Sequence, residues 1–168
     1  IVEFMKQLTP NSDRVGVWLY DEDSMDYKVN FTGNTSAAIE TIEDLEDTRL
    51  MELQEGQNSA DDGGRVPDFY RYLSNVVNKM ADNEDLPRRR ILVVISDGRT
   101  SNERSATIER KLTQIIERAR DAGIKIYSFA ASSADQDMFP YLSRVADETY
   151  GVYRKLGDST DDLEAAIT

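Results

Sequence analysis

The chain has 168 residues, of which 39% are hydrophobic and 31% charged, as expected for one globular domain with a sizeable core. It contains no cysteine and no histidine, which excludes disulfide scaffolds, thiol nucleophiles, histidine-based triads and zinc sites built on those ligands. The formal net charge of −12 argues against nucleic acid or an anionic membrane surface as the main partner. That balance favours cations, basic proteins or simple solubility. No apolar run approaches the roughly 20 residues that a membrane span needs.

Strand patterns and helical periodicities alternate along the chain. The strand patterns lie at residues 15–20, 27–31, 91–95, 124–129 and 152–156. Apolar residues at helical spacing lie at residues 1–8, 67–80, 108–119, 142–146 and 163–167. Residues 91–95 are consecutive branched apolar residues, typical of a central parallel strand that is covered on both faces. The alternation predicts a single α/β domain over residues 1–168, with a doubly wound, mostly parallel sheet flanked by helices.

Three polar stretches interrupt this pattern. Residues 43–64 are acidic and polar with two glycines near their end, which predicts a loop or an insertion. Asp21, Asp23 and Asp26 are spaced like part of a calcium loop, but a methionine occupies a ligand position, which favours a solvated hairpin turn. Three arginines at residues 88–90 precede the central strand, where a charged, solubilising patch is favoured over a partner site.

The best candidate site follows the most apolar strand directly. In doubly wound sheets, ligands bind at the carboxyl ends of the strands. The strand at residues 91–95 continues into a carboxylate, a glycine, an arginine and two hydroxyls: Asp97, Gly98, Arg99, Thr100 and Ser101. Such residues are also common in plain turns, so their spacing alone fits a binding edge and an ordinary loop equally well.

Two blocks of sequence carry a resemblance to a known family. Residues 91–99 read ILVVISDGR, and residues 119–129 read ARDAGIKIYSF. Both closely resemble the von Willebrand factor type A domain, whose members carry a VVITDG strand and loop and an A-x-x-x-G-I-x-I-Y join. Residues 13–17 are similar to the opening of the family's second strand, and the likeness covers nearly the whole chain except residues 43–64. The resemblance implies a Rossmann-like binding fold and not an enzyme.

The resemblance also implies a metal-ion-dependent adhesion site. Family members typically hold Mg²⁺, and an acidic group of a partner protein completes its coordination by oxygen atoms. Asp97 matches the family's metal-ligating aspartate, and Gly98 to Ser101 then form the ligand-binding edge. The family's ligating threonine has no counterpart, because residues 60–73 contain neither threonine nor serine. The carboxylates near that position are candidate substitutes: Asp61, Asp62 and Asp68.

The family's remaining metal ligands, an Asp-x-Ser-x-Ser motif, belong to its first strand. This chain begins on Ile1, within the helix that follows that strand, so motif and strand are missing from it. The missing strand is central in the family and pairs with the strands that correspond to residues 15–20 and 91–95. We expect upstream residues of a larger, multi-domain chain to supply it, because unpaired backbone groups in a core cost about 1–3 kcal/mol each.

These features predict an adhesion or extracellular-matrix module that binds collagen or another matrix protein, with Mg²⁺ at a site incomplete in this chain. Two alternatives stay open: a structural scaffold domain with a vestigial metal site, and an intracellular domain of this fold in a chaperone-like or cofactor-insertion assembly. An enzyme is not favoured, because the nucleophile-elbow, phosphate-loop and dinucleotide-binding motifs are absent. Asn30 and Asn34 begin N-glycosylation sequons, which favours an extracellular location.

Overall fold

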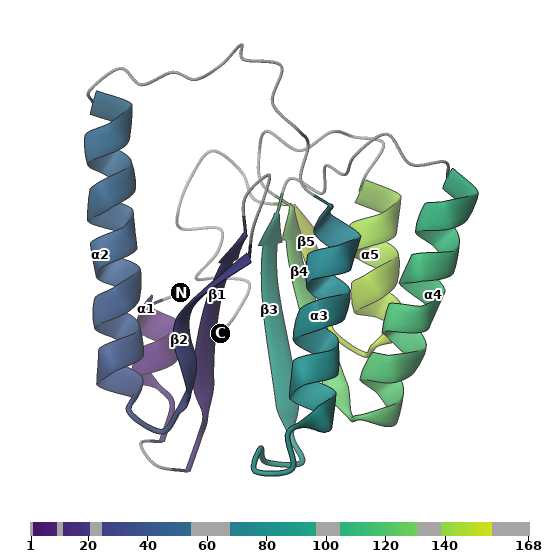
Figure 1. Cartoon of the computed structure of the whole chain (residues 1–168), viewed down its shortest axis with the longest axis horizontal. Helices are drawn as coiled ribbons and strands as arrows, with labels where there is room; N and C mark the ends of the chain where they lie inside the picture. Colours follow the sequence, from purple (N-terminus) through teal and green to yellow (C-terminus); the bar gives the residue numbers. More distant parts are fainter. Residues whose placement is uncertain are drawn as a thin grey trace. The chain divides into compact units, whose positions relative to one another are not determined.

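The fold is seen in a computed structural model that describes residues 2–9, 12–20, 25–54, 68–96, 105–130 and 139–155 (Figure 1). The chain divides into two compact units. Unit 1 comprises residues 1–65 with 167–168, and unit 2 comprises residues 66–166. The helix expected at residues 163–167 and the turn expected after residue 20 lie outside the described residues.

Unit 1 contains α1 (Val2–Lys6), β1 (Val15–Tyr20), β2 (Met25–Thr32) and α2 (Thr35–Gln54). β1 and β2 pair in antiparallel fashion, and their register shifts near the start of β1. Gly16 lies at this irregularity, where an added Cβ atom would lie 2.6 Å from the ring of Trp18. The Trp18 ring also meets Phe31 edge-on, with 5.1 Å between ring centroids. Glycine therefore leaves room for the chain's single tryptophan to pack across the hairpin.

Helix α2 corrects one expectation from the sequence. Residues 43–54, assigned to an acidic loop or insertion over residues 43–64, continue the helix that begins at Thr35. No proline or glycine interrupts residues 35–54, and alanine, leucine, glutamate and glutamine favour a helix. Because acidic side chains dilute the apolar periodicity of this segment, the helical pattern is weak. Residues 55–64 lie outside the described residues.

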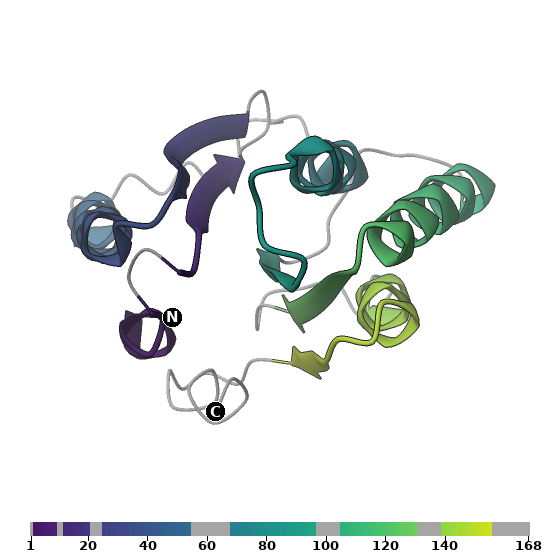
Figure 2. The same cartoon turned by 90° about the horizontal axis from the view of Figure 1, so that it is seen from below.

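Unit 2 contains three parallel strands in the order β3-β4-β5: β3 (Arg90–Ser96), β4 (Ile124–Ala130) and β5 (Tyr153–Lys155). Its helices are α3 (Phe69–Asp82), α4 (Ser105–Asp121) and α5 (Phe139–Glu148), which lie along one side of these strands (Figure 2). The alternation of strands and helices confirms the predicted α/β class with a parallel sheet flanked by helices.

The core of unit 2 lies between the strands and these helices. The apolar stripes predicted for the helices are buried, with Leu112 and Ala119 of α4 fully enclosed. On β4, Ile124 and Ile126 are buried, whereas the side chain of Lys125 between them is exposed. Gly123 ends α4 with a positive φ of 67°, as its position in the sequence predicted.

Two strands have an edge without a partner strand in the described part of the chain. β1 pairs there only with β2, and β3 pairs there only with β4. Each strand has one large apolar side chain that is exposed to solvent: Leu19 on β1 is 39% exposed, and Ile95 on β3 is 38% exposed. The strand that we expect to pair with both of them is not among the described residues.

Arg90 corrects the interpretation of the three arginines at residues 88–90. Arg88 and Arg89 are exposed, as a solubilising patch predicts. The Arg90 guanidinium instead donates hydrogen bonds to backbone carbonyl groups at the end of α3 and in the following loop. Its two terminal nitrogens lie 2.7 Å from Met80 O and 3.1 Å from Asn83 O, and its Nε lies 3.1 Å from Pro87 O. It therefore satisfies acceptors that the helix leaves open.

Candidate functional site

The candidate site lies at the carboxyl end of β3. Ser96, the last residue of β3, is 5% exposed and stands in register with Ala130 of β4. Asp97 follows Ser96 directly in the sequence. The side chains of the predicted site, Asp97 to Ser101, lie outside the described residues, as do Asp61 and Asp62.

Of the three substitute carboxylates, the structure describes Asp68, at the start of α3. Its Oδ1 accepts a hydrogen bond from the backbone N–H of Arg71 at 3.0 Å, which caps the helix. Its Oδ2 forms an ion pair with Lys111 Nζ of α4 at 3.1 Å. The Asp68 side chain is 21% exposed and the Lys111 side chain 27%. Both carboxylate oxygens thus already have a donor, which argues against Asp68 as a metal ligand.

A buried hydroxyl lies in the first turn of the same helix. Tyr70 is fully buried, and its hydroxyl has no hydrogen-bond partner among the described residues. The Tyr70 ring meets Tyr141 of α5 edge-on, with 6.3 Å between centroids. Burial raises the pKa of the Tyr70 hydroxyl well above its usual value, and the neighbouring Tyr141 and Glu109 add to the rise. The hydroxyl is therefore held in its neutral form.

Tyr70→Phe is expected to leave the free energy of unfolding at pH 7 unchanged or to raise it by about 1 kcal/mol, because it removes an unpaired buried hydroxyl. The folded-state pKa of Tyr70 is raised, so its neutral form favours folding below the ordinary pKa of 10.0 and stability falls as the pH rises above it. Urea unfolding from pH 7 to 11 should show a smaller alkaline loss for the variant. Tyr150→Phe, which alters an exposed hydroxyl, is the control. Equal alkaline losses in both variants would contradict the assignment.

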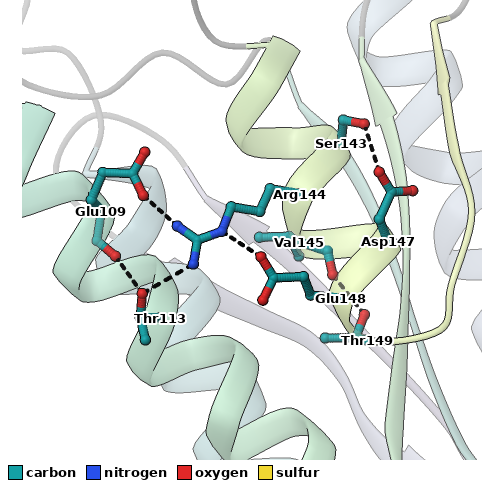
Figure 3. A network of polar contacts seen from close by, with 8 residues as sticks. All are labelled: Glu109, Thr113, Ser143, Arg144, Val145, Asp147, Glu148 and Thr149. Carbon is teal, nitrogen blue, oxygen red and sulfur yellow. Dashed lines mark hydrogen bonds and ion pairs between the residues drawn. The ribbon is translucent and has the colours of Figure 1, made fainter.

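Arg144 of α5 joins two helices in the network of Figure 3. Its Nε donates to Glu148 at 2.6 Å, one guanidinium nitrogen pairs with Glu109 of α4, and the other donates to Thr113 Oγ1 at 3.2 Å. The hydrogen bond to Glu148 is the main cause of a raised pKa for Arg144. One cation is thus shared between two carboxylates, and the network links α4 to α5.

The described residues by themselves do not form a Mg²⁺ site. They contain no group of three or more acidic, histidine or cysteine side chains able to hold a metal ion. Asp68 is engaged with Lys111. Mg²⁺ requires hard oxygen ligands, and Asp97, the ligand predicted from the sequence, lies outside the described residues.

The two predicted glycosylation residues lie on unit 1. Asn30, on β2, and Asn34, just before α2, both have exposed side chains. Asn34 Oδ1 accepts a hydrogen bond from Ala37 N at 3.3 Å, which caps α2. Its Nδ2, the atom that a glycan would modify, is not used in this cap, so capping and glycosylation are compatible.

Sequence reasoning missed the polar contacts made by Asp68 and Arg144. The order Pro67-Asp68 before an apolar stripe is a helix-start signal and could have assigned Asp68 to the cap of α3. The spacing of Arg144 and Glu148 predicts an ion pair within a helix. No local pattern, however, links Lys111 to Asp68 or Arg144 to Glu109, because these partners come from different helices.

Comparison with known families agrees with the geometry of the sheet. The profile of the von Willebrand factor type A domain matches residues 1–165. No curated protein matches the chain significantly. Within the described part of the chain, no helix has the length and apolar character to cross a membrane.

Proposed function

Because the chain belongs to the von Willebrand factor type A domain family, whose members are generally non-catalytic protein-binding modules, we propose that it is an adhesion or extracellular-matrix module. In this proposal, a matrix protein such as collagen binds at the carboxyl edge of β3. The observation that carries the proposal is the position of Asp97, directly after the buried end of a parallel strand. Gly98 to Ser101 would form the ligand-facing loop.

The proposal includes Mg²⁺ at this edge. Asp97 would supply a carboxylate, and the remaining oxygen donors would come from other segments. The bound ion would attract an acidic group of the partner protein. Because Asp68 is paired with Lys111, and residues 60–73 hold no hydroxyl side chain other than tyrosine, we expect Mg²⁺ binding by this chain alone to be weak.

Asp97→Ala is expected to abolish the weak, Mg²⁺-dependent binding of the chain to immobilised collagen, because it removes the carboxylate that the proposal assigns to the ion. The melting temperature in EDTA should stay unchanged, because the substitution lies outside β3. Surface plasmon resonance with alternating Mg²⁺ and EDTA measures the effect. Asp121→Ala, which removes an exposed carboxylate at the end of α4, is the matched control. Collagen binding that survives Asp97→Ala would contradict the proposed edge.

A structural scaffold domain with a vestigial metal site is the second candidate. The commitment of Asp68 to Lys111 and to the cap of α3 favours it. In that case, calorimetric titration with Mg²⁺ alone gives no heat of binding, and EDTA leaves any collagen binding unchanged. The two candidates therefore differ in a measurement that needs no knowledge of the natural ligand.

An extracellular location is part of the leading proposal. The exposed positions of Asn30 and Asn34 support it, because both amides are accessible for N-glycosylation in the folded chain.

A further inference from the structure

The turn after α5 places a tyrosine where the backbone favours glycine. Gly151 N donates to Ala146 O at 2.9 Å and Tyr150 N to Asp147 O at 3.3 Å, which is the pattern of a Schellman helix end. Tyr150 occupies its left-handed position, with a φ of 60°. Residues with a Cβ atom are strained in this conformation, and glycine is the usual occupant.

The flanking residues impose this conformation on Tyr150. The buried Thr149 hydroxyl donates to Val145 O at 2.7 Å and accepts from Ile126 N of β4 at 3.1 Å. Gly151 lies so close to the same strand that an added Cβ atom would be 1.9 Å from Ile126 O. The path of the turn is thus fixed on both sides of Tyr150.

The side chain of Tyr150 projects into solvent. It is 69% exposed, the highest value among the large hydrophobic side chains that the structure shows as exposed. The guanidinium of Arg120, in the last turn of α4, lies over its ring at 5.8 Å from the centroid. Arg120 is itself exposed and has no ion pair with a described carboxylate. A strained, exposed aromatic residue beside an unpaired arginine is unusual for a position with a purely structural role.

The described surroundings of this pair carry charges of both signs. Gly123 N donates to Arg120 O at 3.0 Å, and Gly123 also approaches the backbone of Arg88, whose side chain is exposed. Asp147 and Glu148, at the end of α5, are bonded to Ser143 and Arg144. Glu117 and Asp121, on the same helix as Arg120, are exposed carboxylates.

We propose that Tyr150 and Arg120 form a contact site for a protein segment that presents carboxylates. Tyrosine and arginine are the residue types that dominate binding energy at protein interfaces. The Arg120 guanidinium is exposed, so its N–H groups are accessible to a carboxylate, which arginine can bind in bidentate fashion. The pair lies by the amino ends of β3 and β4, whereas Asp97 follows the carboxyl end of β3. The site is therefore separate from the proposed adhesion edge and needs no metal ion.

A titration of the full chain with a blocked hexaglutamate peptide tests this site, with ¹H–¹⁵N NMR spectra as the readout. We expect saturable shifts at the amides of Arg120, Gly123, Tyr150 and Gly151, and none with hexalysine. Arg120→Ala should weaken hexaglutamate binding at least fivefold. Arg110→Ala, which removes the same charge from an exposed position earlier in α4, should leave binding unchanged.

Tyr150→Gly separates binding from folding. Relief of the left-handed strain should raise the melting temperature by about 2–4 °C, while hexaglutamate binding weakens at least fivefold. Binding unaffected by Tyr150→Gly, or weakened equally by Arg110→Ala, would overturn the proposal, as would the absence of saturable shifts. Asp97→Ala should leave hexaglutamate binding intact, so failure of the adhesion proposal and failure of this one are distinguishable.

Discussion

Gly151→Ala is expected to lower the free energy of unfolding by about 3 kcal/mol or more. The new Cβ atom would lie 1.9 Å from Ile126 O and 2.5 Å from the carbonyl carbon, both backbone atoms of β4. A flexible side chain could move away from such a contact, but β4 is held in register between β3 and β5. The strand or the turn must therefore shift. A shift of the turn also strains the buried hydrogen bond from Ile126 N to Thr149 Oγ1.

Urea unfolding followed by circular dichroism measures this loss. Gly123→Ala is the control, because Gly123 has a positive φ but its added Cβ atom would have no described neighbour closer than 3.5 Å. Only backbone strain then opposes the substitution, at a cost of about 1–2 kcal/mol. If Gly151→Ala costs no more than Gly123→Ala, the close approach of the turn to β4 is wrong.

Arg90→Ala is expected to cost about 2–3 kcal/mol of folding free energy, because hydrogen bonds from a charged donor are worth more than neutral ones. Its guanidinium donates to Met80 O, Asn83 O and Pro87 O, and so joins the end of α3 to the start of β3. Without it, carbonyl groups of the last helical turn lose their donor in a partly buried setting.

Arg89→Ala is the matched control, because it removes the same charge from the adjacent, exposed position and should change stability by less than about 0.5 kcal/mol. Arg90→Lys should recover part of the loss, since a single ammonium group cannot reach several carbonyl groups in the planar geometry of arginine. Equal losses in Arg90→Ala and Arg89→Ala would show that net charge, and not the cap, determines the effect.

Much of the fold could be predicted because its signals are local. The apolar run of β3 and the stripes of α3 and α4 follow from side-chain burial at fixed periods along the chain. Sequence reasoning missed α2 because its acidic side chains leave little apolar periodicity, although its residues favour a helix. The candidate site at Asp97 stays a prediction, made from its position directly after the most apolar strand.

By itself, the sequence determined the α/β class and the family, both of which depend on patterns of residues close together in the chain. Tertiary structure alone decided that Asp68 pairs with Lys111, that Arg90 closes α3 and that Tyr150 is strained beside Arg120. These contacts join segments separated along the chain, and a side chain's partner is fixed only when packing brings such segments together. The residues next to an arginine or tyrosine in the sequence therefore do not indicate which distant group its side chain will contact.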